Sequence, residues 1–317
     1  MINRKGLEFT FSWIFAIIAG TVILFSAIYI TTKLIGSNEI ERNTFVASEL
    51  SNILSPIETN LEDSKYSLIE FTDETRVYNE CSNLGVFGKQ QLSTSSKKSG
   101  SNGWSEQSIR KSSFNKYIFS RKVEDTDGTK MHVLASPLTM PFKIGDILIM
   151  HGRNYCFVNP SSAIEEKFNE LSSNGMQDIG VNITNNIDSC PRNSTKVCFN
   201  QIGCDVNVNT LANVVTKSGK NLYYYGDSLQ LAAIFSDTEI YECQIKRLAS
   251  RAGELGSLYA RKALYIEGSG CNNNLVSDLQ SFVLRTNVSN SADFRQLGQI
   301  AEELEERNDG LASCKVF

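Results

Sequence analysis

Histidine and closely spaced cysteine pairs are scarce or missing in this chain. Its 317 residues include two histidines, His132 and His151, and no C-x-x-C pair. Structural zinc sites use closely spaced cysteine and histidine ligands. A serine or cysteine nucleophile needs a base, which is most often histidine. We therefore expect no metal, no cofactor and no enzymatic activity, and we expect both histidines to be surface or structural residues.

An excess of positive charge is also missing. The chain has 31 basic and 35 acidic residues, which gives a net charge of −4, and it has no basic tail. Proteins that bind nucleic acid carry a basic patch or stripe. Nucleic acid is therefore not an expected partner.

Charged residues are absent from residues 9–30, which are almost entirely apolar. A helix of this length spans roughly 33 Å, close to the hydrocarbon core of a bilayer. Arg4 and Lys5 precede the run, as in a cleaved secretory signal, but the apolar run of such a signal has about 7–15 residues. The sequence therefore favours an uncleaved transmembrane anchor at residues 9–30, with membrane lipid as its partner.

The charges on either side of this anchor predict its orientation. Arg4 and Lys5 lie before it, whereas Lys33 is followed by Glu39 and Glu41. Positive residues favour the cytoplasmic side. We expect a cytoplasmic tail at residues 1–8 and a single pass through the cell membrane, with the remainder of the chain extracellular.

The first residues resemble the start of an archaeal type IV prepilin. Arg4, Lys5 and Gly6 are followed by Leu7, Glu8 and the apolar helix. The resemblance implies cleavage between Gly6 and Leu7, and assembly through the N-terminal helix. Glu8 would then be the second residue of the processed chain, whereas the best-known pilins have an acidic residue at the fifth. The whole chain also resembles large single-pass surface proteins of an uncharacterised archaeal family.

The apolar helix is expected to continue beyond the membrane. Apolar residues at 46, 50, 53, 54 and 57 fall on one face of a helix. We expect a helical stalk at residues 31–60, ending near Pro56, and a total helix length of roughly 70 Å. Its apolar face needs a cover, either the chain's own globular domain or a neighbouring subunit.

Eight cysteines all follow the anchor, which indicates up to four disulfides in an exported region. They are Cys81, Cys156, Cys190, Cys198, Cys204, Cys243, Cys271 and Cys314. Their pairing cannot be deduced from sequence, although an up-down-up arrangement of the last helices would bring Cys271 and Cys314 to one end. Asn182, Asn193 and Asn287 lie in N-x-S/T sequences and are candidate glycosylation sites.

The remaining pattern predicts an α+β ectodomain with a mixed or antiparallel, β-rich part at residues 61–228. Strands are expected at 66–71, 87–92, 116–121, 131–138 and 144–150, and a βαβ unit is expected within 155–183. The polar run 93–101 is expected to be an exposed loop. A C-terminal helical region of about three helices is expected at 229–317. Five basic residues on its first long helix, among them Arg247, are expected to form a solvated face.

Gly226-Asp227-Ser228-Leu229 resembles the first block of the GDSL esterases and lipases, in which the serine is the nucleophile. That family takes its base from a histidine near the C-terminus, and no histidine follows His151 here. Asp227 and Ser228 are also preferred helix N-cap residues, and this interpretation is favoured. The expected function is a membrane-anchored extracellular structural or binding protein, and the resemblance to prepilins implies pilin-like assembly. The alternative is an anchored serine hydrolase that uses Ser228.

Overall fold

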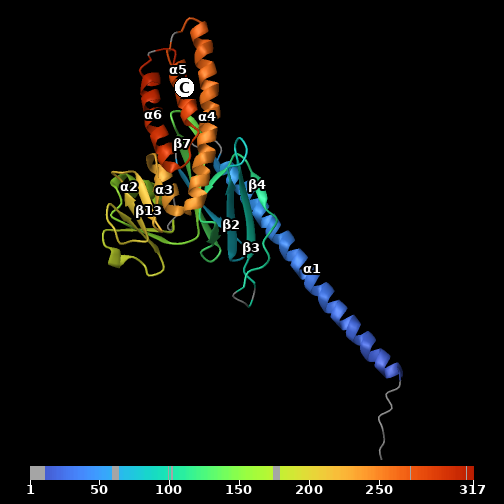
Figure 1. Ribbon diagram of the computed structural model, residues 1–317. Helices are drawn as coiled ribbons and strands as arrows, with labels where there is room; N and C mark the ends of the chain where they lie inside the picture. Colours follow the sequence, from blue (N-terminus) through green and yellow to red (C-terminus); the bar gives the residue numbers. More distant parts are fainter. Residues whose placement is uncertain are drawn as a thin grey trace, which may run out of the picture.

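The computed structural model describes residues 11–58, 64–98, 100, 103–173, 179–271, 273–311 and 313–317. This part of the chain has the expected α+β architecture, with a long N-terminal helix, three β-sheets and a set of C-terminal helices (Figure 1). The helices are α1 (Phe11–Glu58), α2 (Ser162–Ser173), α3 (Gly226–Phe235), α4 (Thr238–Gly268), α5 (Val276–Arg285) and α6 (Ser291–Asp309), with a 3-10 turn η1 (Ile187–Ser189).

Two four-stranded sheets follow α1. The first has the order β1-β7-β8-β5 and the second the order β4-β3-β2-β6. Their strands are β1 (Lys65–Glu70), β2 (Thr75–Ser82), β3 (Lys89–Ser96), β4 (Lys111–Ser113), β5 (Tyr117–Phe119), β6 (Val123–Asp125), β7 (Lys130–Thr139) and β8 (Lys143–His151). The second sheet is antiparallel throughout, whereas β5 and β8 in the first run parallel.

The third sheet has six strands in the order β10-β9-β11-β12-β13-β14. They are β9 (Tyr155–Val158), β10 (Val181–Thr184), β11 (Thr195–Phe199), β12 (Val206–Asn209), β13 (Val214–Lys217) and β14 (Lys220–Tyr223). Strands β9 and β10 pair in parallel and α2 connects them, so the predicted βαβ unit is confirmed.

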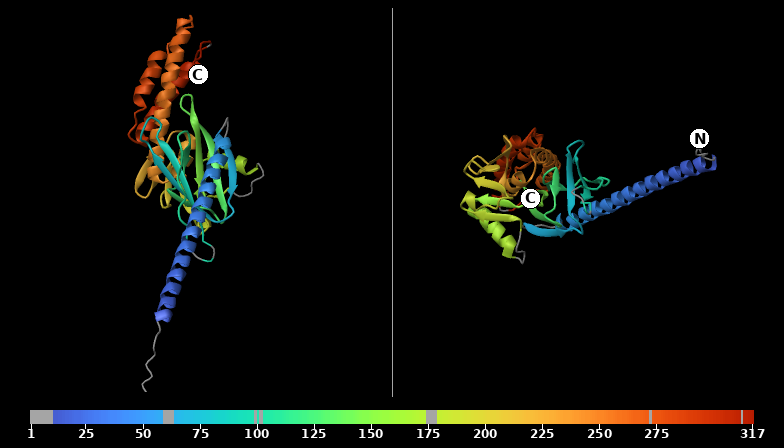
Figure 2. Two further views of the ribbon diagram at one scale, coloured as in Figure 1. Left: turned by 90° about the vertical axis from the view of Figure 1, so that its right-hand side faces the viewer. Right: turned by 90° about the horizontal axis from the view of Figure 1, so that it is seen from below.

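Helix α1 runs through the predicted stalk as far as Glu58. It leaves the globular part in the direction opposite to the helical tip, which is the end of the molecule formed by α5, α6 and the last part of α4 (Figures 1 and 2). At about 1.5 Å per residue it is roughly 72 Å long. Only its second half contacts the ectodomain, where Ala47, Leu50 and Leu54 are fully buried. Leu50 and Leu54 belong to a core cluster with residues of both four-stranded sheets, so the chain's own domain covers this face.

The prediction of an exposed loop at residues 93–101 was wrong for its first four residues. Ser93 to Ser96 form the end of β3 and are buried beneath α1. Their polar groups are satisfied, because the hydroxyls of Thr94 and Ser96 donate to the backbone and side-chain oxygens of Asn43 at 2.8 and 3.1 Å. Burial without partners would be costly, but here a helix distant in sequence supplies them.

The predicted basic face of α4 was wrong for Arg247, which is 1% exposed. Its guanidinium donates to the carbonyl oxygens of Phe87, Lys116 and Phe114 at 2.8–3.0 Å, and to Gln244 Oε1 at 2.7 Å. The described residues provide no carboxylate for this cation, and burial lowers its pKa to about 10. Arg247 therefore fastens α4 to the loops around β3, β4 and β5.

The largest core cluster joins the six-stranded sheet to the C-terminal helices. Phe157 of β9 packs against Phe168 of α2, Phe199 of β11 and Phe235 of α3, with ring centroids 5.4–6.0 Å apart. Tyr241, near the start of α4, lies in the same cluster and is fully buried. The helices and this sheet therefore share one hydrophobic core.

All eight cysteines are paired in four disulfides. The bonds are Cys81–Cys243, Cys156–Cys190, Cys198–Cys204 and Cys271–Cys314. The last is the pair that the helix arrangement predicted. The first is the longest in sequence, with a separation of 162, and it joins β2 to α4.

Candidate functional site

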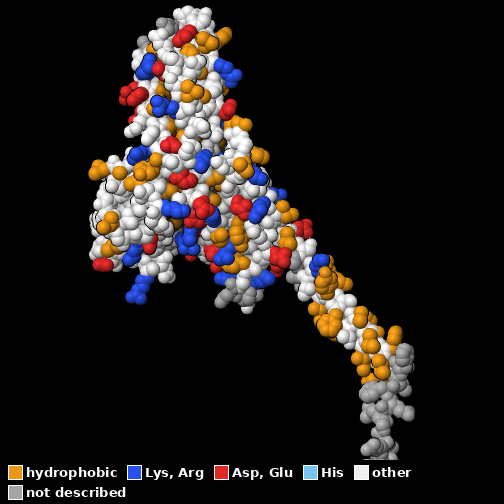
Figure 3. Space-filling view, in the orientation of Figure 1, with side chains coloured by type: hydrophobic (Ala, Val, Ile, Leu, Met, Phe, Trp, Pro, Cys, Tyr) orange, Lys and Arg blue, Asp and Glu red, His pale blue; other side chains and the backbone are white. Residues whose placement is uncertain are grey.

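The exposed half of α1 is the most distinctive surface of the molecule. Among the described residues, α1 is the one helix that is long and apolar enough to cross a membrane. Its large apolar side chains are exposed from Trp13 to Leu34 (Figure 3). Apolar surface in water is costly, at roughly 25 cal/mol per Å². This half of α1 therefore needs a cover that the single chain does not supply.

Two small residues lie on this exposed half. Ala16 and Gly20 are four residues apart, which is the spacing that allows two helices to approach closely in lipid. A Cβ atom added to Gly20 would have no heavy atom within 4 Å. A larger side chain at Gly20 can therefore be accommodated within the single chain.

The docked half of α1 is held by polar as well as apolar contacts. Asn43 is 1% exposed, and its Nδ2 donates to Ser105 Oγ at 2.8 Å and to the Glu106 carbonyl at 2.9 Å. Arg42 forms an ion pair with Asp73 at 3.1 Å. These contacts begin about 8 residues after Leu34, so the exposed half ends roughly 12 Å from the domain.

The expected processing site at Gly6 and Leu7 lies outside the described residues. The three candidate glycosylation residues are described, and Asn182, Asn193 and Asn287 are all exposed. Asn182 lies on β10, an edge strand of the six-stranded sheet. Each of these side chains is therefore accessible for modification.

Ser228 contacts other hydroxyl groups and a carbonyl rather than a base. Its Oγ lies 2.6 Å from Ser136 Oγ and 3.4 Å from the carbonyl oxygen of Pro137, and Ser136 Oγ lies 2.8 Å from Ser64 Oγ. Within the described chain, no titratable side chain forms a hydrogen bond with Ser228. The hydrolase alternative gains no support from this arrangement.

The N-cap interpretation of Asp227 and Ser228 was wrong. Helix α3 begins at Gly226, with Tyr225 as its N-cap residue, and no side chain caps it by a hydrogen bond. Gly226 has a φ of 71°, a left-handed conformation that favours glycine. This backbone turn lets the helix start one residue before Asp227, which therefore lies in the first turn.

The two histidines form a buried stack. The rings of His132 and His151 are 4.9 Å apart, and His151 also stacks on Phe235 at 4.6 Å. Burial, and then the neighbouring His132, lower the pKa of His151 to about 3. A pairing of His151 with a Cys156 nucleophile is excluded in this structure, because Cys156 is bonded to Cys190. Both histidines have a structural role, as expected.

Glu124 is a buried carboxyl group that sequence reasoning missed. It is fully buried on β6, and its Oε1 accepts a hydrogen bond from the Gly152 amide at 3.1 Å. Its Oε2 has no hydrogen-bond partner among the described residues. Burial raises the pKa of Glu124 to about 7. The surrounding sequence, Val-Glu-Asp, is typical of an exposed strand, so the sequence does not indicate that Glu124 is buried.

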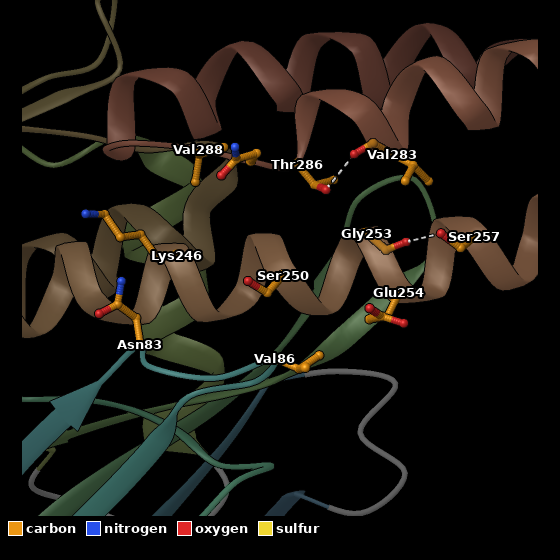
Figure 4. Close-up of a pocket in the computed structure, with 11 residues that line it drawn as sticks. Asn83, Val86, Lys246, Ser250, Gly253, Glu254, Ser257, Val283, Thr286 and Val288 are labelled. Carbon is orange, nitrogen blue, oxygen red and sulfur yellow. Dashed lines mark hydrogen bonds between the residues drawn. The ribbon is translucent and has the colours of Figure 1, made fainter.

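A polar groove of about 410 Å³ separates α4 from the loop after α5 (Figure 4). Lys246 and Glu254 are its charged side chains. Two of the hydroxyl groups that line the groove already donate hydrogen bonds within the chain, Ser257 to the Gly253 carbonyl and Thr286 to the Val283 carbonyl. The groove has no acid–base pair that would indicate catalysis.

Comparisons with known proteins give no relationship from which a function could be transferred. No protein-family model matches the chain, and no match is found among curated proteins or solved structures. The function must therefore be inferred from the residues themselves.

Proposed function

We propose that this chain is a single-pass membrane protein that displays a disulfide-bonded structural or binding ectodomain outside the cell. The observation that carries the proposal is the division of α1 into an exposed apolar half and a docked half. Lipid is the solvent in which such an uncharged helix is stable. Four disulfides fit an oxidising compartment. Arg4 and Lys5 favour a cytoplasmic N-terminus.

The proposal extends to pilin-like assembly through the same half of α1. The basis is the Arg4-Lys5-Gly6 start, together with the exposed Ala16 and Gly20, which leave room for a second helix. Lateral partners would be further copies of the chain or other membrane and surface proteins. The docked half of α1 is already occupied by the ectodomain, so assembly would use the first half.

Intact mass of the protein from its native membrane tests processing and topology together. We expect a loss that corresponds to residues 1–6, and a gain of two hydrogens for each of the four disulfides on reduction. A full-length mass would contradict prepilin-type processing but leave the anchor intact. No gain on reduction would contradict the oxidised, external ectodomain.

Substitution of Gly20 tests assembly separately. Gly20→Leu places a branched side chain where close helix packing requires none, and the added Cβ has no heavy atom within 4 Å beyond the backbone of its own helix. We expect a smaller oligomer in detergent, measured by light scattering, with unchanged ectodomain stability. Val22→Leu, roughly on the opposite side of α1, is the matched control. Equal oligomer sizes for both variants and wild type would exclude assembly through this face.

A further inference from the structure

A cleft of about 550 Å³ lies where the end of α3 meets the start of α4, beside the six-stranded sheet. Four cationic side chains line it, Arg121, Arg153, Arg192 and Lys217, and they come from four different segments. In Figure 1 the start of α4 is its end away from the helical tip, so the cleft lies towards the side from which α1 departs. Basic side chains also show on this lower part of the ectodomain in Figure 3.

The acidic residues of the cleft are engaged with its walls. Asp237 accepts a hydrogen bond from the Lys122 amide at 2.9 Å, and its other oxygen lies 3.7 Å from Arg121 Nε. Asp205 accepts from the Lys196 amide at 2.9 Å. Neither carboxylate forms an ion pair with Arg153 or Arg192. Four cations and two carboxylates give the lining a formal charge of +2 when Lys217 is protonated, and burial lowers the pKa of Lys217 to about 7.

Arg153 and Arg192 provide the available positive charge. Both are exposed, and neither side chain has a hydrogen-bond or ion-pair partner in the described part of the chain. Lys217 differs, because its ammonium group donates to the carbonyl oxygens of Ala233, Ile234 and Ser236. Lys217 therefore stabilises the last turn of α3 and forms a wall of the cleft, while the two arginines can turn towards a ligand.

Tyr155 adds a buried polar group to the lining. The residue is 3% exposed, and its ring packs against His151 and Phe235. Its hydroxyl has no hydrogen bond to any described residue. Burial, and then the nearby Glu124, raise the pKa of Tyr155, so the hydroxyl stays protonated and can donate. An uncommitted donor nine-tenths buried in a positive cleft is a feature of a binding site.

We propose that this cleft binds a phosphate group, with Arg153 and Arg192 as its ionic ligands and Tyr155 and Arg121 as further donors. Guanidinium groups bind phosphate by paired, charge-assisted hydrogen bonds. The lining keeps a net positive charge even when Lys217 is neutral, and the two guanidinium groups of Arg153 and Arg192 suit a phosphate dianion better than a single carboxylate. A tetrahedral group also accepts donors that approach from several segments at once. The phosphate could belong to a soluble ester or to a lipid headgroup, and the inference does not depend on assembly through α1.

Calorimetric titration of the full-length protein in a nonionic detergent tests the proposal. The probes are inorganic phosphate, glycerol phosphate and, as a carboxylate of similar size, glycerate. Asn193 lines the cleft and is a candidate glycosylation site, so each measurement uses an Asn193→Gln background that cannot carry a glycan there. We expect both phosphate probes to bind more tightly than glycerate. Absence of phosphate binding, or tighter binding of glycerate, would overturn the proposal.

Matched variants locate the site. Arg153→Gln with Arg192→Gln should lower phosphate affinity by about tenfold or more, which is roughly 1.4 kcal/mol. The control, Lys246→Gln with Arg285→Gln, changes net charge equally on the distant helices α4 and α5. Tyr155→Phe should lower affinity less while leaving the circular dichroism spectrum unchanged. Equal affinities in the arginine variant and the control would overturn the assignment.

Vesicle flotation separates the two sources of phosphate. Full-length protein in nanodiscs of neutral lipid is mixed with vesicles of phosphatidic acid in phosphatidylcholine or of phosphatidylcholine alone. Flotation with phosphatidic acid that is lost in the arginine variant supports a lipid headgroup. Binding of soluble glycerol phosphate without flotation supports a soluble ester. If the arginine variant still floats with phosphatidic acid vesicles, and neither soluble phosphate probe binds the protein, the proposed site is overturned.

Discussion

The sheet β4-β3-β2-β6 and the six-stranded sheet are attached to their helices by different means. Asn43 of α1 and Arg247 of α4 hold the sheet β4-β3-β2-β6 and its connecting loops through buried and part-buried hydrogen bonds. The six-stranded sheet meets α2 and α3 mainly through aromatic packing around Phe157, and the Lys217 ammonium group adds hydrogen bonds to the carbonyl oxygens at the end of α3. Apolar packing tolerates swaps of similar volume, whereas a buried polar group requires its specific partners. The stability of the attachment to β4-β3-β2-β6 should therefore be the more sensitive to conservative substitution.

Removal of the disulfide between β2 and α4 should have the largest effect on stability. Cys81→Ala with Cys243→Ala opens a loop of 162 residues, whereas Cys198→Ala with Cys204→Ala opens one of 6. Loop-closure entropy makes the first loss larger by on the order of 3 kcal/mol. Urea unfolding of the full chain in mild detergent measures both losses. Equal losses would indicate that the sheet β4-β3-β2-β6 holds α4 without help from the Cys81–Cys243 bond.

Arg247→Met should lower the free energy of unfolding by about 3–5 kcal/mol, because the carbonyl oxygens of Phe87, Lys116 and Phe114 lose their donor, and the bond to Lys116 is fully buried. Arg247→Lys should recover only part of this loss, since one ammonium cannot reproduce the planar fork. Arg251→Met, one turn further along α4 and only half-buried, is the control and should cost less than about 1 kcal/mol. A loss as small as that of the control would contradict the polar attachment.

The pH dependence of stability should reveal two opposing buried groups, Glu124 on β6 and His151, which ends β8 and stacks on Phe235 of α3. Glu124 has its pKa raised from 4.5 to about 7, so its contribution to stability is lost as pH rises through that range. His151 has its pKa lowered from 6.5 to about 3, so its contribution is lost as pH falls through that range. Between pH 4.5 and 6.5 the two slopes, each about 1.4 kcal/mol per pH unit, oppose each other.

Single substitutions should reveal how each of the two groups makes the free energy of unfolding depend on pH. In that range, stability of Glu124→Gln should rise with pH and stability of His151→Gln should fall with pH. Urea midpoints measured at several pH values test this, with wild type as the reference. If the two variants and wild type show parallel profiles of stability against pH, the pKa values of Glu124 and His151 are not shifted as their burial implies.

The smallest expected effect is at the junction with α1. Asn43→Ala should cost about 1–3 kcal/mol, because it removes the side-chain acceptor of the Ser96 hydroxyl and the donor to Ser105 Oγ and the Glu106 carbonyl. Asn52→Ala, an exposed position on the same helix, should be nearly neutral. The measurement is hydrogen exchange of the β3 amides. Unchanged exchange in Asn43→Ala would show that apolar contacts alone hold α1.

Apolar patterns in the sequence allowed prediction of much of this fold, including α1, the strands β7 and β8, the βαβ unit and a long first helix in the C-terminal region. The misses are buried polar residues. Ser96, Glu124 and Arg247 look like surface residues in sequence, because the groups that satisfy them lie far along the chain. Asn43 and Ser105 are 62 residues apart, and Arg247 and Phe114 are 133 apart. The cationic cleft was missed for the same reason, since its arginines come from separate loops.

The bond between Cys81 and Cys243 also determines how the molecule would transmit a mechanical load. A pull on the helical tip reaches β2 through a covalent bond. The junction between β3 and the docked half of α1 has only hydrogen bonds and packing, and no cysteine lies on α1. Under tension between the tip and the free end of α1, the first contact to yield would be this junction. The ectodomain would separate from its helix before its own sheets came apart.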